Sequence, residues 1–162
     1  MQKSTSYTLE EARKKLEHYC AYQERCHQEV EQKLRQMKMI PQAIEHIIGQ
    51  LIQDNYLNET RFCQSFARGK FRIKKWGKDR IVRELKMRHI STYNIKIALN
   101  EIEEEEYLIT LKALAQKFWE SNAHRKPILR KKKVIDALRY RGWERTLIYD
   151  IIASLENNLK AK

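Results

Sequence analysis

The sequence has little of what builds turns and sheets. Its 162 residues include only four glycines and two prolines. Leu, Ile, Lys, Arg, Glu and Gln dominate, and all are tolerable or good helix formers. No apolar run approaches the roughly 18 residues that read as a membrane-spanning helix. The first residues, MQKSTSYTLEE, lack the apolar centre of a secretory signal peptide. We therefore expect an almost entirely helical, cytoplasmic protein with no membrane partner.

Patterns of catalysis and of cofactor binding are lacking as well. The sequence contains no glycine-rich phosphate loop, no H-E-x-x-H and no nucleophile elbow. The odd number of cysteines favours reduced thiols. His18, Cys20, Cys26 and His27 lie close in sequence, but not at the C-x₂₋₄-C spacing of structural zinc sites, so buried thiols are the better interpretation. We expect no catalytic residue, no cofactor and no metal site.

What the sequence does contain is one apolar template in three copies, about fifty residues apart. Within each copy the spacings are 4, 5, 5, 4 and 3, typical of two helical faces joined by a short break. The copies are Val30, Leu34, Met39, Ile44, Ile48 and Leu51; Ile81, Leu85, Ile90, Ile95, Leu99 and Ile102; and Val134, Leu138, Trp143, Ile148, Ile152 and Leu155. A fixed period of this size indicates stacked helical units that cannot bury their apolar faces alone.

The template predicts an all-α fold with nine main helices, arranged as three tandem three-helix repeats in residues 1–57, 58–108 and 109–162. Thr8, Asn58 and Ser91 are expected to cap helices, and Pro41 and Pro127 to occupy first turns.

In the helix after Asn58, the apolar residues Phe62, Phe66 and Ile73 should share the buried face. The arginines at 61, 68 and 72 should fall on the opposite, exposed face.

The charge is positive and unevenly distributed. The net charge is +12, with eleven Lys and Arg in residues 61–90 and nine in residues 125–145. Between these blocks lie Glu101 and the run Glu103–Glu106, into which we expect the sixth helix to continue. A solvated helix face explains this run better than an active site does. Ion pairing between repeats and repulsion of wrong partners both remain open as its role.

The basic residues are the strongest candidates for a functional surface. Arg35, Lys86 and Arg139 occupy the same position in the three copies, and Arg80 and Lys133 are likewise equivalent. Regularly spaced positive charge suits a repeating anionic partner, such as a nucleic-acid backbone or a protein–nucleic acid filament. A solvated outer face is the simpler alternative. The candidate partner-binding residues are Arg61, Arg68, Arg72, Lys74, Lys75, Arg80, Arg83, Lys86, Lys132, Lys133 and Arg139.

Two tryptophans allow different interpretations. Trp143 stands at a template position and is expected in the core. Trp76 follows two lysines and is the more exposed candidate for stacking on a base.

Several short motifs occur in a characteristic order. Residues 56–62 read YLNETRF, followed by Ala67-Arg68, Trp76-Gly77 and IVREL at 81–85. Residues 138–143 read LRYRGW. In order and spacing, these motifs resemble the RecX family of bacterial recombination regulators over about residues 9–155. The family usually has glycine where this sequence has Lys38 and His89.

The resemblance implies an elongated, curved array and a regulatory, non-enzymatic role. Its expected partners are the RecA recombinase and the RecA–single-stranded DNA filament, with DNA itself as a further candidate. Inhibition of recombinase and ATPase activity would modulate DNA repair, recombination and the SOS response. A repeat rod of this kind is expected to be a monomer. The alternative is a general DNA- or RNA-binding helical module that competes for nucleic acid, because basic three-helix units resemble helix-turn-helix domains.

Overall fold

The computed structural model describes residues 6–161, which form nine α-helices and no strand. The helices are α1 (Leu9–Tyr22), α2 (His27–Gln36), α3 (Pro41–Gln53), α4 (Glu59–Arg72), α5 (Lys78–Met87), α6 (Thr92–Leu99), α7 (Glu104–Ser121), α8 (Pro127–Tyr140) and α9 (Arg145–Lys160). The predicted all-α class is confirmed. Within the described part of the chain, no helix is long and apolar enough to cross a bilayer.

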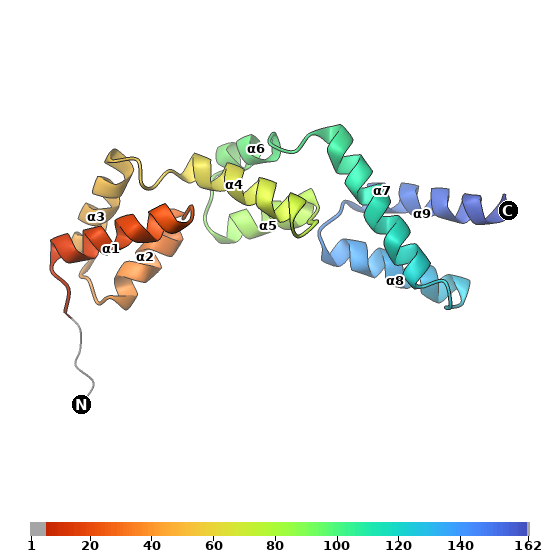
Figure 1. The fold of residues 1–162 in the computed structure, drawn as a ribbon, viewed down its shortest axis with the longest axis horizontal. Helices are drawn as coiled ribbons and strands as arrows, with labels where there is room; N and C mark the ends of the chain where they lie inside the picture. Colours follow the sequence, from red (N-terminus) through yellow and green to blue (C-terminus); the bar gives the residue numbers. More distant parts are fainter. Residues whose placement is uncertain (1–5, 162) are drawn as a thin grey trace, which may run out of the picture.

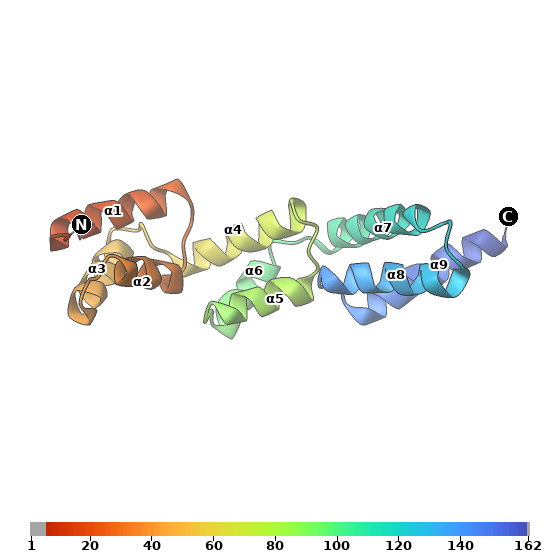
Figure 2. The ribbon, with the colours of Figure 1, turned by 90° about the horizontal axis from the view of Figure 1, so that it is seen from below.

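The helices are arranged in three groups along one long axis (Figure 1). The main helix packing runs within α1–α3, α4–α6 and α7–α9, which we call units 1, 2 and 3. Figure 2 shows α1, α4 and α7 along one side of the rod and α2, α5 and α8 along the opposite side. Corresponding helices of successive units therefore face the same way.

The apolar template accounts for the core of each unit. Every third-copy residue is buried, and in the other two copies the only exceptions, Met39, Ile48 and Leu99, are half-buried. The buried side chains of unit 1 form one cluster, whereas those of units 2 and 3 form a second, continuous cluster that Cys26 joins from unit 1. Units 2 and 3 thus share a core, while unit 1 is largely separate from it.

The three copies also share the turn that follows their second helix. Lys38, His89 and Gly142 all have positive φ, at 61°, 59° and 88°. In each copy the next amide donates back to the template leucine, as Met39 does to the Leu34 carbonyl at 3.1 Å. This is the left-handed C′ geometry that glycine favours. The turn is therefore kept where lysine and histidine replace glycine.

Two predictions about helix faces and ends are wrong. Ile73 was expected in the core but is 78% exposed. Ala67 and Phe71 take the inward positions one turn apart, and α4 ends at Arg72, so Ile73 lies beyond the last turn on the solvent side.

The run Glu103–Glu106 does not extend the sixth helix. α6 ends at Leu99, and Glu103 is the N-cap of α7, whose first turn holds the next three glutamates. Carboxylates are favoured there because the first N–H groups of a helix carry partial positive charge. The predicted boundary between residues 108 and 109 would cut through α7, which begins at Glu104. The outer ends of the first and third predicted units, residues 1–5 and 162, lie outside the described residues.

Candidate partner-binding surface

A joint between α8 and α5 brings the basic residues of units 2 and 3 into line. The Gly77 amide donates to the Arg141 carbonyl at 2.8 Å, and the Asp79 amide donates to the Gly142 carbonyl at 3.0 Å. The first N–H groups of a helix have no partner within that helix, so the end of α8 caps the start of α5. Figure 2 shows the two helices end to end along one side of the rod.

Two glycines permit this close approach. A Cβ at Gly77 would overlap the backbone of Gly142 and Trp143, and a Cβ at Gly142 would overlap Arg80. Gly142 also has φ of 88°, a conformation that other residues adopt only with strain. The joint therefore depends on the absence of side chains at both positions.

Aromatic and polar side chains fill the space beside the joint. The rings of Tyr107 and Trp143 lie 4.5 Å apart between centroids, and the Trp143 indole donates to the Lys75 carbonyl at 3.1 Å. The Tyr107 hydroxyl donates to Glu144 and accepts from the Lys78 amide. Burial, and then the neighbouring carboxylate, raises the pKa of Tyr107, so the phenol stays a neutral donor. Trp143 lies in the core, as predicted.

The predicted site residue Arg61 is engaged inside the molecule. Its guanidinium pairs with Glu24 of unit 1 at 2.5 Å and donates to the carbonyls of Asn55 and Tyr56. It therefore holds units 1 and 2 together and has little freedom to meet a partner.

Arg68 and Arg72 face acidic residues just before α7 and in its first turn. Arg68 pairs with Glu101 at 3.0 Å, and Arg72 pairs with Glu106 at 3.7 Å. The Arg72–Glu106 pair joins α4 to α7 and so supports ion pairing between repeats, one of the two roles left open by the sequence, whereas Arg68 pairs with Glu101 just beyond α6. The charge of the arginine face is largely balanced there.

Arg80 belongs to the joint. Its guanidinium lies 4.1 Å from the Trp76 ring centroid and 4.9 Å from that of Tyr140, and it donates to the Tyr140 carbonyl at 3.1 Å. Trp76 is half-buried, and the ammonium of Lys70 lies 4.9 Å from its ring. The cationic groups of Arg80 and Lys70 therefore already lie over the Trp76 ring, on which a base was expected to stack.

The remaining predicted residues are all exposed, and none joins an ion pair between side chains that the structure describes. Lys74 and Lys75 follow α4. The other five lie on the two aligned helices, and we call them the α5–α8 basic edge: Arg83, Lys86, Lys132, Lys133 and Arg139. The edge is open rather than a deep pocket; a shallow hollow on α5 is lined by Asp79, Val82, Arg83, Lys86 and Met87.

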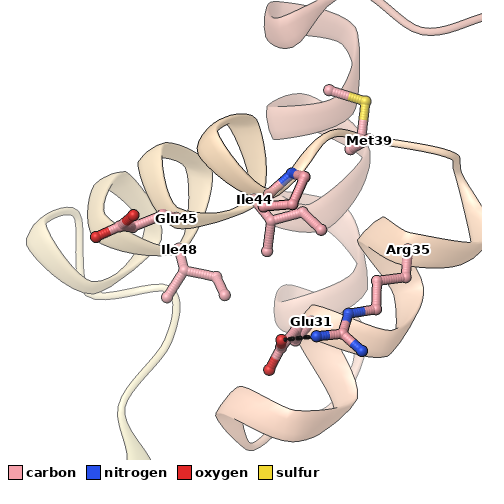
Figure 3. A pocket seen from close by; sticks show the side chains of 7 residues that line it. Glu31, Arg35, Met39, Ile44, Glu45 and Ile48 are labelled. Atoms are coloured by element: carbon pink, nitrogen blue, oxygen red, sulfur yellow. Dashed lines mark hydrogen bonds and ion pairs between the residues drawn. The ribbon is translucent and has the colours of Figure 1, made fainter.

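Unit 1 does not continue this edge. Figure 3 shows the corresponding hollow between α2 and α3, where Arg35 pairs with Glu31 at 2.6 Å and Glu45 stands on the opposite wall. The positive charge that the repeat places at Arg35 is therefore compensated locally.

The sequence difference behind this compensation is a single position. Four residues before the shared basic residue, the counterparts of Glu31 in units 2 and 3 are Val82 and Ile135, so this ion pair has no equivalent there. Asp136 lies three residues before Arg139, but no ion pair joins these two described side chains. The edge is therefore confined to units 2 and 3.

Sequence analysis missed the joint. Gly77 is the N-cap of α5, and glycine is common at that position, so its residue type alone gave no sign of a close approach of backbone. Nothing local marks Tyr107, because its partners Lys78 and Glu144 lie 29 and 37 residues away.

Fold and site together define a class, the tandem arrays of three-helix units that present an extended basic edge. Residues 58–99 match the family model described as RecX, second three-helix domain. Regulatory protein RecX of Lactobacillus gasseri is 33% identical over 90 residues, which cover 56% of this chain and 33% of that protein. Regulatory protein RecX of Bacillus cytotoxicus is 26% identical over 138 residues, which cover 85% of this chain and 51% of that protein.

Solved structures show the same fold. A crystal structure of RecX from Lactobacillus salivarius matches with a TM-score of 0.78 at 24% identity, over 91% of this chain and 96% of that one. A second crystal structure of regulatory protein RecX matches with a TM-score of 0.80 at 21% identity, over 90% of this chain and 73% of that one. The predicted resemblance is confirmed, and this chain is similar to RecX proteins in the sequence of its second unit and in its fold. It spans about a third to a half of the length of the curated relatives it matches.

Proposed function

We propose that this chain is a regulatory protein that binds RecA and the RecA–single-stranded DNA filament and inhibits its ATPase and recombinase activity. The relatives it matches are named regulatory protein RecX, which supports a regulatory role. The observation that carries the proposal is the α5–α8 basic edge, held straight by the α8–α5 joint. An extended, regularly charged edge suits a repeating partner better than a small molecule.

The proposed mechanism is a coupling between binding and filament geometry. A ligand that spans neighbouring subunits favours whichever arrangement of subunits it fits, so it lowers activity if that arrangement is not the active one. The joint fixes units 2 and 3 relative to each other, so binding of a partner need not order the connection between them. Once one unit has bound, the other is held near the partner at a high effective concentration. The positive edge also speeds encounter with phosphate or acidic protein surface.

The deciding experiment is RecA ATPase on single-stranded DNA, titrated with this protein at sub-stoichiometric ratios. A regulator should inhibit well below the amount needed to coat the DNA. The double variant Lys86→Glu, Arg139→Glu should inhibit at least about tenfold less, equal to about 1.4 kcal/mol of lost binding. Arg35→Glu, a reversal at the equivalent position of unit 1, is the matched control and should inhibit like the parent. Equal inhibition by the double variant and the parent would contradict the proposal.

A general nucleic-acid-binding role is the second candidate, favoured by the basic edge on three-helix units. Such a protein would inhibit only at DNA-coating amounts and would bind free single-stranded DNA as tightly as it binds the filament. The same titration, repeated with DNA alone by fluorescence anisotropy, separates the two. We further propose that the protein acts as a monomer in the cytoplasm, a setting supported by three free, buried thiols.

A further inference from the structure

A second surface lies along α4, where unit 1 meets unit 2. It is a groove of about 320 Å³ between the segment after α1 and one face of α4. We call it the α4 groove; Phe62, Phe66, Gly69, Lys70, Ile73 and Lys74 line it on the α4 side. It is separate from the α5–α8 basic edge, with which it shares no residue.

The floor of the groove is apolar and open. The rings of Phe62 and Phe66 pack with centroids 5.7 Å apart, and Ile73 leaves most of its surface in solvent. Gly69 lies inside α4, where glycine costs about 1 kcal/mol relative to alanine. A Cβ at Gly69 would meet nothing within 4 Å. The packing of the fold therefore does not require this glycine, and the space beside it is open.

The rim of the groove is positively charged. Lys74 is exposed and joins no ion pair between described side chains, and the ammonium of Lys70 lies 5.5 Å from the Phe66 ring centroid. Glu24 also lines the groove; its Oε1 pairs with Arg61, while its Oε2 is buried and has no hydrogen-bond partner among the described residues. The groove thus offers apolar contact beside two cations.

We propose that the α4 groove docks an amphipathic segment of a partner protein that carries acidic residues beside its apolar ones. Its aliphatic side chains would lie against the exposed Ile73 and the half-buried Phe66, with its backbone close to Gly69 and its carboxylates near the two lysines. This is the helix-in-groove mode of recognition, with charge complementarity at the rim. Nucleic acid fits less well, because Phe62 is buried, Phe66 is covered by the cations of Lys70 and Arg88, and so no open aromatic face is offered to a base. The inference is independent of the proposed action on RecA.

The test uses the full chain and three labelled synthetic peptides of equal length, followed by fluorescence anisotropy. One peptide is an amphipathic Leu/Glu helix, one its Leu/Lys counterpart, and one a Ser/Glu peptide without an apolar face. We expect saturable binding of the Leu/Glu peptide only. Gly69→Phe should fill the groove and weaken that binding at least about tenfold, a loss of about 1.4 kcal/mol.

Gly49→Phe is the matched control. Gly49 also lies inside a helix, α3, and a Cβ there also meets nothing within 4 Å. This variant should bind the Leu/Glu peptide within about twofold of the parent. Gly69→Ala, which adds helix propensity and little bulk, checks that α4 tolerates substitution, and circular dichroism confirms folding of each variant.

Any of five outcomes would overturn the proposal. The Leu/Glu peptide does not bind, or the Leu/Lys peptide binds as tightly. Gly69→Phe binds the Leu/Glu peptide as the parent does. A single-stranded oligonucleotide loses affinity on Gly69→Phe, which would make the groove a nucleic-acid surface. Sedimentation shows self-association that Gly69→Phe abolishes, which would make the occupant a second copy of this chain.

Discussion

At the scale of single residues, the two glycines of the joint are the most constrained positions. Gly77→Ala and Gly142→Ala should each lower the free energy of unfolding by about 3 kcal/mol, because the added methyl overlaps backbone or Arg80. Thermal or urea unfolding followed by circular dichroism measures this. Gly49→Ala, in open space within α3, should instead stabilise by about 0.5–1 kcal/mol. Equal effects at the three positions would mean that the joint does not constrain the fold.

Four buried groups with a raised pKa, among them Cys20 at about 11, predict a loss of stability in alkali. Burial raises the pKa of Cys26 to about 11 and that of Cys63 to about 12, and it raises the pKa of Tyr107 as well. Above pH 9, the ordinary thiol value, the unfolded chain releases protons that the folded chain retains. Because deprotonation stabilises only the unfolded chain in this range, the free energy of unfolding falls as pH rises from 9 to 11.

The measurement is urea unfolding at a series of pH values. Cys63→Ala should be less stable at neutral pH, because it loses buried contacts, but its decline between pH 9 and 11 should be shallower. A decline identical to that of the parent would show that the thiol does not contribute to it.

At the scale of helices, capping residues identified from the sequence do what their chemistry predicts. The Asn58 side chain accepts from the Arg61 amide at 3.0 Å, whereas Glu103, the N-cap of α7, makes no such side-chain bond. Asn58→Ala should therefore cost about 1 kcal/mol of stability. Glu103→Ala should cost less, since only the interaction of its charge with the helix dipole is lost. The order of the two unfolding midpoints tests this, and a larger loss at Glu103 would contradict it.

The buried face of a helix could be predicted where the periodicity of that helix determines it. Contacts with segments distant in the sequence could not be predicted. The template residues repeat every three to five positions, so the sequence alone locates the core of each unit. The exposed face of α4 was also predicted, but its partners were not, because Arg68 and Glu101 are 33 residues apart. Ile73 was misplaced for a related reason, since helical periodicity applies only up to the helix end at Arg72.

At the scale of the whole molecule, the two connections between units differ in kind. Units 2 and 3 share one core and backbone hydrogen bonds, while ion pairs such as Arg61–Glu24 and Arg88–Glu29 link units 1 and 2. Salt screens exposed ion pairs and has less effect on apolar burial. The angle between units 1 and 2 should therefore vary more with ionic strength than that between units 2 and 3. Repeat position alone could not reveal this, because the template is identical at both connections.

The core shared by units 2 and 3 determines how the contribution of unit 3 to partner binding can be tested. Removing unit 3 would expose the core that it shares with unit 2, so changing its charge is the cleaner experiment. Lys132, Lys133 and Arg139 are exposed, and replacing all three with Glu should leave the fold intact. If both helices of the α5–α8 basic edge engage a repeating partner, either half alone loses the gain from linkage.

We therefore expect the unit 3 triple variant to bind RecA–DNA filaments at least about tenfold more weakly than the parent, a change of about 1.4 kcal/mol. Its binding should also depend less steeply on salt, because fewer charge contacts remain. Reversal of Arg83 and Lys86 in unit 2 should have a comparable effect, and combining both sets should remove the residual binding that either half retains alone. Filament binding measured by co-sedimentation at several salt concentrations checks all three variants, with circular dichroism as the control for folding. If the triple variant binds as tightly as the parent, unit 3 serves only to cover the apolar face of unit 2, and the basic residues of α5 carry the interaction alone.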